Sequence, residues 1–427
     1  MKITEKEVIQ FVEQNDVKFI KLAFFDIFGK MKNISIMSSQ LSKAFESGIL
    51  FDASCIKGFM GIQDSNLLLF PDPNTLSVLP WRPQQGRVAR LFCNIKHPNG
   101  DMFDGDGRYI LKKSVDYAKE KGFKVQIGTE CEFYLFNLDE NGQPTKVPQD
   151  LGGYCDVSPL DKGENVRREI CLTLEEMGIQ PETSHHESGP GQNEIDFKNS
   201  GALEAADNLQ TFKTVVNSIA TINGLFASFM PLPIKDTYGS SLHMNFSLIK
   251  NGNNIFNAKS QEDKEIANCF IAGILNRVRE ITLFLNPTVQ SYKRLEKAEV
   301  PKFISWSNFN RSQLIRVPVA SGETSKLELR SPDPSCNPYI AFSLLIYAGI
   351  EGIEKSMKLA DAVDINLYSA DKSISDKFEK LPENLLEAIN LSKQSDFIKS
   401  HISSTILDAF FKEKEHQSAN ESIEECL

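Results

Sequence analysis

The chain has 427 residues, of which 41% are hydrophobic and 24% are charged, and its formal net charge is −10. This length and apolar content fit a folded protein with a large core and more than one domain, and they exclude disordered and fibrous classes. The acidic balance, without any run of basic residues, argues against nucleic acid or an anionic membrane as a main partner.

The cysteines and the apolar segments bear on the cellular compartment. Eight cysteines stand singly along the chain, and no two have the C-x-x-C spacing of a zinc cluster or redox motif. We therefore expect reduced thiols in a cytoplasmic protein. The first residues lack the apolar core of a signal peptide, and the longest apolar run, residues 339–350, is too short to span a bilayer.

The first hundred residues have the pattern of a small, sheet-rich domain. Residues 5–14 have helical spacing of apolar side chains, and three segments have strand composition: 17–25, 31–37 and 88–95. We expect this domain to cover residues 1–105.

From residue 106 onward, longer helical patterns alternate with strands. Helical periodicity is found in residues 108–121, 164–177, 202–222 and 262–284. Residues 337–359 are apolar almost all round, which predicts a buried helix, and residues 412–425 have the composition of a charged, polar tail. We therefore expect an α+β fold whose second domain, residues 106–427, carries the catalytic function.

Polar, chemically active residues alternate with apolar residues on four predicted strands. In residues 129–136, Glu130 and Glu132 share one face, because successive side chains of a strand point to opposite sides. Two carboxylates on one face repel each other unless a cation lies between them, and a divalent metal ion is the obvious candidate. The alternative is a solvent-facing edge strand. The other three strands present Glu194 with Asp196, His243 with Asn245 and Ser247, and Glu328 with Arg330.

A predicted hairpin adds further acidic residues. Glu187 and Glu194 flank a Gly-Pro-Gly turn, so a hairpin would bring their carboxylates together. His185 and His186 are adjacent on a strand and face opposite ways, so at most one of them can bind the same ion. His243 follows a flexible Gly-Ser-Ser segment that allows close approach to a ligand, with a purely structural histidine as the alternative.

Four arginines lie in the same part of the chain as Glu328: Arg294, Arg311, Arg316 and Arg330. Guanidinium groups bind carboxylates and phosphates in bidentate fashion, so the group indicates an anionic substrate and a transferred phosphoryl group, although any one of them could simply be solvated. The sequence contains neither a G-x-x-x-x-G-K-[ST] loop nor a G-x-G-x-x-G fingerprint, so a nucleotide would bind in another way.

Taken in order, these motifs resemble glutamine synthetase of the bacterial type I class. The resemblance rests on Thr129-Glu130-Cys131-Glu132-Phe133, residues 185–196, residues 239–248, Asn286-Pro287-Thr288 to Arg294, Asn310-Arg311-Ser312 to Pro318, Glu328-Leu329-Arg330, Asn337-Pro338-Tyr339 and, before them, residues 51–55, 71–73 and 80–81. It implies a small N-terminal β-grasp domain and a C-terminal catalytic domain with a curved, mainly antiparallel sheet flanked by helices. It also implies active sites between neighbouring subunits of a homododecamer of two hexameric rings.

The resemblance implies a role for each matching residue, with two or three Mg²⁺ or Mn²⁺ ions per active site. One ion is assigned to Glu132, Glu187 and Glu194, and a second to Glu130, His243 and Glu328. Glutamate is assigned to Gly239, Arg294, Glu299 and Arg330, and ATP to Glu182, Asn245, Ser247, Arg311 and Arg316. Arg311 and Arg316 would also neutralise the transferred phosphoryl group. Asp52, from a neighbouring subunit, would take a proton from ammonium, and Glu299 would close the site.

The implied reaction is the ATP-dependent ligation of ammonia to the γ-carboxylate of L-glutamate through γ-glutamyl phosphate. The chain departs from the family pattern in having Tyr238 for Asn, Asn245 and Asn193 for His, Cys55 for Ser, and a flap stretch, residues 296–298, that is one residue shorter and lacks Pro-Gly. Two alternatives stay open: a γ-glutamyl-amine ligase that uses a small amine in place of ammonia, and a non-catalytic relative that regulates a partner.

Overall fold

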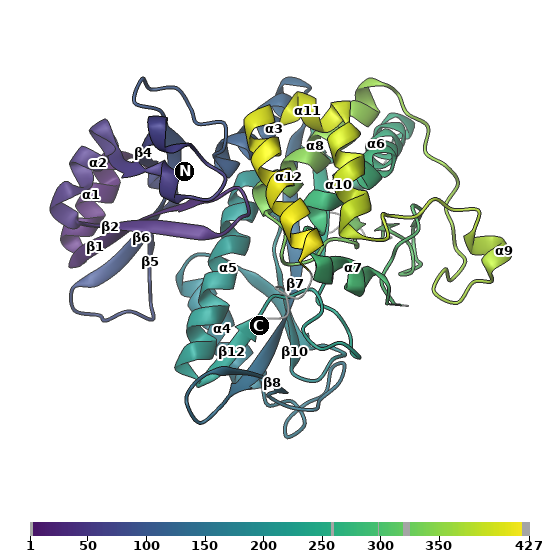
Figure 1. Ribbon diagram of the computed structural model, residues 1–427, viewed down its shortest axis with the longest axis horizontal. Coiled ribbons are helices and arrows are strands. Elements are labelled where there is room, and N and C mark those ends of the chain that lie inside the picture. The colour runs from purple at the N-terminus through teal and green to yellow at the C-terminus, as the bar shows by residue number, and fades with distance from the viewer. Residues whose placement is uncertain (1–2, 258–259, 298, 319–324, 421–427) are drawn as a thin grey trace.

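The computed structural model describes residues 3–257, 260–297, 299–318 and 325–420. These residues form two units, each built around its own β-sheet (Figure 1). The smaller, N-terminal unit has a six-stranded sheet with the order β2-β1-β6-β4-β3, and β5 pairs with β6. Its elements are α1 (Glu5–Gln14), β1 (Val17–Phe25), β2 (Met31–Met37), α2 (Leu41–Ser47), β3 (Ile49–Asp52), β4 (Asn66–Pro71), β5 (Ser77–Val78) and β6 (Arg87–Lys96).

Local sequence explains the elements of the smaller unit. Thr4 begins α1 with a capping box, in which its side chain accepts from the backbone N–H of Glu7 while the Glu7 carboxylate accepts from the N–H of Thr4. β1 runs parallel to β6 and antiparallel to β2, and Ile20, Leu22 and Leu91 are fully buried in the sheet. The predicted helix and strands of this region are confirmed, and β6 is one residue longer at each end than predicted.

The larger unit contains an eleven-stranded sheet in which β7 is central. The main strand order is β15-β16-β17-β13-β7-β10-β9. In addition, β8, β11 and β12 pair with β7, and β14 pairs with β13. The described pairs are antiparallel except β15 with β16. The strands are β7 (Lys124–Leu138), β8 (Pro144–Pro148), β9 (Pro181–His186), β10 (Gln192–Phe197), β11 (Ser200–Gly201), β12 (Leu225–Ser228), β13 (Leu242–Lys250), β14 (Asn253–Asn254), β15 (Trp306–Ser307), β16 (Ile315–Arg316) and β17 (Leu327–Leu329).

Helices flank this sheet, and in Figure 1 most of them gather above β7 while α4 and α5 lie beside it. They are α3 (Gly107–Glu120), α4 (Glu164–Glu176), α5 (Ala202–Ile222), α6 (Gln261–Leu285), α7 (Val289–Leu295), α8 (Pro338–Glu354), α9 (Lys372–Ser375), α10 (Leu385–Gln394), α11 (Asp396–His401) and α12 (Ser404–Ala419). α8 is buried over residues 338–350, as predicted, and ends five residues earlier than expected. It packs closely on α6 at Gly352, where a Cβ would lie 2.1 Å from the carbonyl oxygen of Cys269. The absence of a side chain at this glycine allows the close approach.

The predicted polar tail at residues 412–425 is wrong up to Ala419, because α12 continues through that part. Its apolar residues Leu407, Phe410 and Phe411 are buried, and the ring of Phe410 stacks on Phe284 and on Phe28 of the smaller unit. The polar residues after Phe411 therefore extend a docked helix. Residues 421–425 lie outside the described residues.

A buried arginine joins the two units. The guanidinium group of Arg108, on α3, lies 2.9 Å from the carboxylate of Asp72 in the smaller unit and 3.0 Å from that of Asp207 on α5. Tyr339, on α8, donates its hydroxyl to Asp207 at 2.6 Å. These contacts fix the orientation of the smaller unit. The predicted domain boundary between residues 105 and 106 stays a prediction. None of the helices in the described part of the chain combines the length and apolar content that a membrane span requires.

We expect Arg108→Met to lower the free energy of unfolding by about 3–5 kcal/mol, because it removes the ion-pair partner of the buried Asp207 and of the half-buried Asp72. Urea denaturation of the purified protein measures this loss. Arg279→Met is the matched control, because Arg279 forms partly exposed pairs with Glu379 and Glu387 and should change stability by less than about 1 kcal/mol. Equal losses in the two variants would contradict the structural role of Arg108.

Candidate active site

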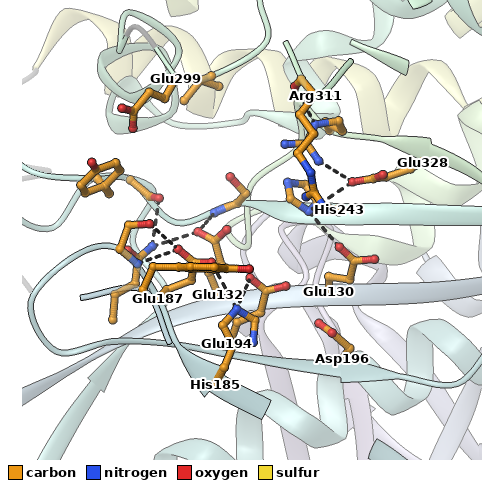
Figure 2. Close-up of a pocket in the computed structure, with 18 of the residues that line it drawn as sticks. Glu130, Glu132, His185, Glu187, Glu194, Asp196, His243, Glu299, Arg311 and Glu328 are labelled. Atoms are coloured by element: carbon orange, nitrogen blue, oxygen red, sulfur yellow. Dashed lines mark hydrogen bonds and ion pairs between the residues drawn. The ribbon is translucent and has the colours of Figure 1, made fainter. Parts of the chain in front are cut away.

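A cavity of about 1340 Å³ opens beside the polar face of β7, β10, β13 and β17 (Figure 2). It exceeds the roughly 300–1,000 Å³ of a typical small-molecule pocket, so it has room for more than one ligand. The predicted site residues that line it are Glu130, Glu132, Glu187, Glu194, Gly239, His243, Glu299, Arg311, Arg316, Glu328 and Arg330. Residues from five strands and five loops therefore meet at one cavity.

The first acidic cluster consists of Glu132, Glu187 and Glu194. Glu132 on β7 lies directly opposite Glu194 on β10 in the strand register, and Glu187 follows β9. The carboxylate of Glu132 accepts from the side-chain amide of Gln192 at 2.9 Å and from the backbone N–H of Ser241 at 2.8 Å. Backbone and side-chain donors thus hold Glu132 in place at the cavity wall.

His185 lies beside this cluster, whereas His186 lies behind it. Nε2 of His185 is 3.3 Å from the carboxylate of Glu187 and 3.9 Å from that of Glu194. His186 is 1% exposed, and its ring nitrogens face Asp150 at 2.8 Å and the carbonyl oxygen of Glu187 at 2.6 Å. The prediction that the two histidines face opposite ways is confirmed.

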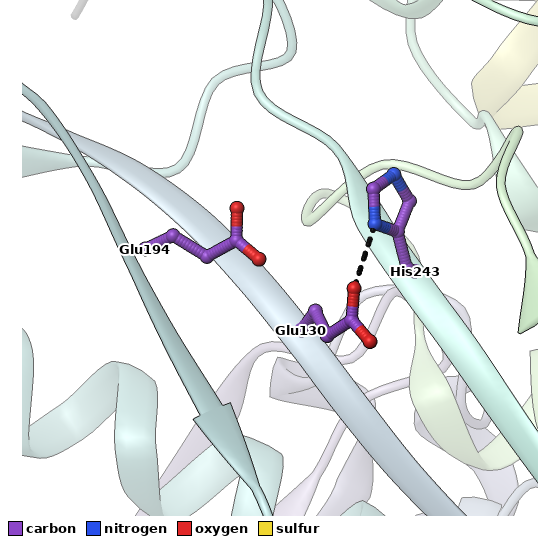
Figure 3. Close-up of side chains that lie close together, drawn as sticks. All are labelled: Glu130, Glu194 and His243. Atoms are coloured by element: carbon purple, nitrogen blue, oxygen red, sulfur yellow. Dashed lines mark hydrogen bonds and ion pairs between the residues drawn. The ribbon is translucent and has the colours of Figure 1, made fainter. Parts of the chain in front are cut away.

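The second cluster consists of Glu130, His243 and Glu328. Nδ1 of His243 lies 3.1 Å from the carboxylate of Glu130 and 3.7 Å from that of Glu328. Glu130, Glu194 and His243 also each offer a ligand atom within 4.8 Å of the others, and Figure 3 shows their side chains converging from three strands. Around the cavity, the described triads whose ligand atoms all lie this close together are Glu130, Glu194 and His243, and His185, Glu187 and Glu194. They share Glu194, so the two predicted clusters are adjacent.

Positive neighbours compensate the first cluster only in part, since Arg294 and Arg330 act to lower the pKa of Glu132 but do not offset its burial. Burial raises the pKa of Glu132 to about 8, and the nearby Glu187 adds to the rise. Burial also raises the pKa of Glu194 strongly, and Glu132 and Asp196 add to it. Buried carboxylates that repel one another in this way are stabilised by a divalent cation. The oxygen-rich donor set fits Mg²⁺ or Mn²⁺.

The second cluster already has positive neighbours. Burial opposes ionisation of Glu130, but His243 and Lys326 hold the pKa of its carboxyl well below the ordinary range. Burial likewise opposes ionisation of Glu328, but Arg330 and His243 lower its pKa. Both carboxylates are consequently ionised and ready to act as ligands.

Three predicted arginines lie near these carboxylates. Arg316 donates to Glu328 at 2.8 Å, and Arg330 donates to the other oxygen of Glu328 and, at 3.1 Å, to the carbonyl of Arg311. Arg311 is exposed and lies with Glu299 across the cavity from the first cluster (Figure 2). Positive charge therefore faces the carboxylates over the space where an anionic ligand would lie.

Arg294 supports the cavity wall from behind. It is fully buried and donates to the hydroxyl of Ser241 at 2.8 Å and to the carbonyl oxygen of Ser331 at 3.0 Å. A Cβ on Gly239 would lie 2.6 Å from Cγ of Arg294, so only glycine lets the backbone pass over this side chain.

Four other predicted residues do not line the cavity. Asn245 is 2% exposed and donates to the carboxylate of Glu130 at 2.8 Å. Ser247 is buried and accepts from the side-chain amide of Asn199, and Glu182 is exposed on β9. Asp52 is exposed in the smaller unit, where it accepts from Ser54. The roles predicted for all site residues stay predictions, and Ala298 of the flap stretch lies outside the described residues.

Sequence reasoning missed several residues of the cavity. Gln192 and Lys326 belong to it, and strand alternation could have found both, because Gln192 is two residues before Glu194 and Lys326 two before Glu328. Lys326 lies 2.9 Å from the carboxylate of Glu130. Tyr154, whose ring meets that of His185 edge-on, lies in a loop without any periodic signal.

We expect Mn²⁺ binding to the metal-free protein to release protons near neutral pH, because Glu132 must ionise to become a ligand. Since its pKa is raised to about 8, affinity should increase as pH rises from about 6 to 8 and the carboxyl loses its proton. Calorimetric titration in two buffers with different ionisation enthalpies counts the released protons. Glu132→Gln should reduce the count. A binding enthalpy independent of the buffer would show that Glu132 does not titrate on binding.

Two family models match the chain. One, described as "Glutamine synthetase, catalytic domain", matches residues 104–426, and the other, "Glutamine synthetase, beta-Grasp domain", matches residues 16–98. They confirm the predicted fold class, a β-grasp domain followed by a catalytic domain.

Curated relatives carry the same name. A glutamine synthetase from Clostridium saccharobutylicum is 46% identical over 403 residues, which cover 93% of this chain and 91% of that protein. One from Methanosarcina mazei is 44% identical over 417 residues, covering 96% and 93%, and one from Staphylococcus aureus is 41% identical over 417 residues, covering 96% and 94%.

Solved structures share the architecture. One described as "GmaS/ADP complex-Conformation 1" has a TM-score of 0.88 at 28% identity and covers 98% of this chain and 96% of that one. A Plasmodium falciparum glutamine synthetase, at 23% identity and a TM-score of 0.86, covers 99% and 98% and shows the shared fold alone. With both family models matched and these relatives aligned over nearly the whole chain, the protein belongs to the glutamine synthetase family.

Proposed function

We propose that this protein joins ammonia to the γ-carboxylate of L-glutamate at the expense of ATP, and releases glutamine, ADP and phosphate. The observation that carries the proposal is the pair of carboxylate clusters facing arginines across one cavity, in a chain at least 41% identical to relatives named glutamine synthetase. These names do not favour the γ-glutamyl-amine ligase or the non-catalytic relative. A cytoplasmic location is consistent with seven described cysteines that are all free thiols.

The chemistry requires an activated carboxyl group. A carboxylate is a poor acyl donor, so its oxygen attacks the terminal phosphorus of ATP, the bond to ADP breaks, and γ-glutamyl phosphate forms. Ammonia then attacks the acyl carbon and phosphate leaves. Bound Mg²⁺ or Mn²⁺ supplies positive charge to the phosphate oxygens during this transfer. Arg311 and Arg316 add charge from the chain itself, which stabilises the transition state electrostatically.

The residues divide into three binding groups. Glu132, Glu187 and Glu194 hold one cation and Glu130, His243 and Glu328 the second, in a site that binds two or three ions. Gly239, Arg294, Glu299 and Arg330 position glutamate, with Arg294 acting from behind through Ser241. Glu182, Asn245, Ser247, Arg311 and Arg316 position the nucleotide. Of these, Asn245 acts through Glu130, to which it donates.

Asp52 belongs to a different part of the assembly. It is exposed and is absent from the described lining of its own chain's cavity. Its carboxylate accepts from Ser54 N and Oγ at 2.9 and 2.6 Å, which lowers the pKa of Asp52 and keeps it ionised. We propose that it takes the proton from ammonium in the site of a neighbouring subunit, within a dodecamer of two hexameric rings. There, Glu299 shields the acyl phosphate from water.

Glu328→Gln should lower kcat by at least about a hundredfold, because it removes a ligand charge while keeping the side-chain shape. Coupled measurement of ADP and glutamine formation checks this. Glu262→Gln is the control, since that carboxylate is exposed and remote from the cavity lining. Wild-type turnover by Glu328→Gln would refute the metal assignment.

The composite site predicts complementation between inactive variants. We expect Asp52→Ala and Glu328→Gln each to be inactive, and mixed oligomers reassembled from both to recover activity, because some sites then combine an intact Asp52 with an intact Glu328. Activity of refolded mixtures against each variant alone measures the recovery. If mixtures stay inactive although mass spectrometry shows hybrid oligomers, Asp52 serves its own chain's site or none.

The acceptor is tested by offering ammonium or methylamine with glutamate and ATP. We expect phosphate release and product formation to favour ammonium. A preference for methylamine would replace the proposed function by the amine ligase.

A further inference from the structure

Asp150 is a buried carboxylate outside the cavity that connects three segments of the active-site wall. It is 4% exposed and lies between β8 and α4. One oxygen accepts from the backbone N–H of Gly191 at 2.9 Å, from that of Gly152 at 3.2 Å and from Nε2 of His186 at 2.8 Å. The other oxygen accepts from the backbone N–H of Lys162 at 2.9 Å. Asp150 therefore ties the β9–β10 turn to both ends of the loop 151–162.

The contact with His186 leads directly to Glu187. Nδ1 of His186 lies 2.6 Å from the carbonyl oxygen of Glu187, while Nε2 lies 2.8 Å from the carboxylate of Asp150. Both partners are acceptors, so both contacts are hydrogen bonds when the ring carries a proton on each nitrogen. The backbone N–H of Glu187 in turn donates to the carbonyl of Gln192 at 2.8 Å. Since Asp150 also binds Gly191, the turn that separates Glu187 from Glu194 is held at both ends by one carboxylate.

The same carboxylate places the loop 151–162 against the cavity. A Cβ on Gly152 would lie 2.9 Å from Nε2 of His186, so glycine allows the loop to pass close to the ring. Two residues later, Tyr154 lines the cavity with its ring edge-on to His185, at 5.4 Å between centroids. The backbone N–H of Cys155 donates to the carbonyl of His186 at 3.0 Å. Loop and turn are thus one hydrogen-bonded layer behind the first acidic cluster.

We propose that Asp150 is a positioning residue that orients Glu187 and Glu194 toward their cation, and that it acts through His186 and the backbone of Gly191. The inference rests on the proposed function, because it concerns the ion that these carboxylates would hold. Partners behind the ligands of a metal site orient those ligands, and their loss typically costs about 10–100-fold in affinity. The position requires an acceptor-only group, because all four of its partners are donors.

Asp150→Asn tests the proposal, because the amide keeps the shape of the side chain but turns an N–H₂ group toward one of these donors. Mn²⁺ titration of the metal-free protein, followed by electron paramagnetic resonance, should show one class of site weakened about 10–100-fold and the other unchanged. The unchanged class is the one assigned to Glu130, His243 and Glu328, which Asp150 does not touch. A loss of kcat should accompany the weakened class.

Asp26→Asn is the matched control. Asp26 is 3% exposed and accepts from the backbone N–H groups of Phe28 and Lys30 at 3.0 and 2.9 Å in a turn of the smaller unit. The same substitution there should lower the thermal midpoint without changing either class of Mn²⁺ site. A second variant, His186→Gln, keeps a donor but cannot bridge Asp150 and Glu187. It should weaken the same class of site, and its effect should not add to that of Asp150→Asn.

The outcomes distinguish a failure of the metal assignment from a failure of the positioning role of Asp150. If the wild-type protein binds no Mn²⁺, the metal assignment of the proposed function fails. If the wild-type protein binds two classes of Mn²⁺ and Asp150→Asn gives the same titration, the positioning role is overturned. An equal loss of Mn²⁺ affinity at both classes of site would also overturn the positioning role, because it would indicate a general loosening of the fold. If Asp150→Asn does not fold, His186→Gln is judged by the same criterion.

Discussion

The repulsion among carboxylates buried on one face of β7 and its neighbours constrains the whole site. Glu132 lies opposite Glu194 and Glu130 opposite His243 because β7 pairs with β10 on one side and β13 on the other. A slip of one residue in either pairing would turn the opposing side chain to the other face. The reverse face prevents such a slip, since Cys131, Ile195 and Met244 are fully buried there. The apolar core therefore sets the register that places the charges.

The two clusters solve the electrostatic problem in different ways. In the second cluster, Lys326, Arg316 and Arg330 lie within hydrogen-bonding distance of Glu130 or Glu328, so the chain itself supplies much of the compensating charge. In the first cluster, burial and mutual repulsion raise the pKa values of Glu132 and Glu194. A divalent cation consequently relieves more repulsion in the first cluster than in the second. The side chains that can bind an anionic ligand, in contrast, lie beside the second cluster, namely Arg316, Lys326 and Arg330.

Strand alternation, a local property, predicted the residues on which the metal hypothesis depends. It placed Glu130, Glu132, Glu194, His243 and Glu328 on polar faces, and the structure brings those faces to one cavity. Alternation does not show which strands are neighbours, so the contact between Glu130 and Lys326, 196 residues apart, was not predicted. Loop positions have no period at all, which is why Tyr154 and Asp150 were missed. The prediction of a polar tail at residues 412–425 was wrong for a related reason. It considered these polar residues without the apolar residues just before them, which end at Phe411 and dock α12 on the core.

The join between the two units determines where Asp52 lies, the residue that we propose serves the site of a neighbouring subunit. Asp52 lies at the end of β3, which pairs with β4, and Asp72 follows β4 directly. Arg108 binds Asp72 and Asp207 together, so Asp52 is held at a fixed position relative to the catalytic sheet of its own chain. A carboxylate that serves a neighbouring subunit needs this rigidity, because its distance from the neighbour's cavity then depends only on how subunits pack. The ion pairs at Arg108 thus extend the precision of the catalytic core to Asp52, for which we propose a role outside its own chain.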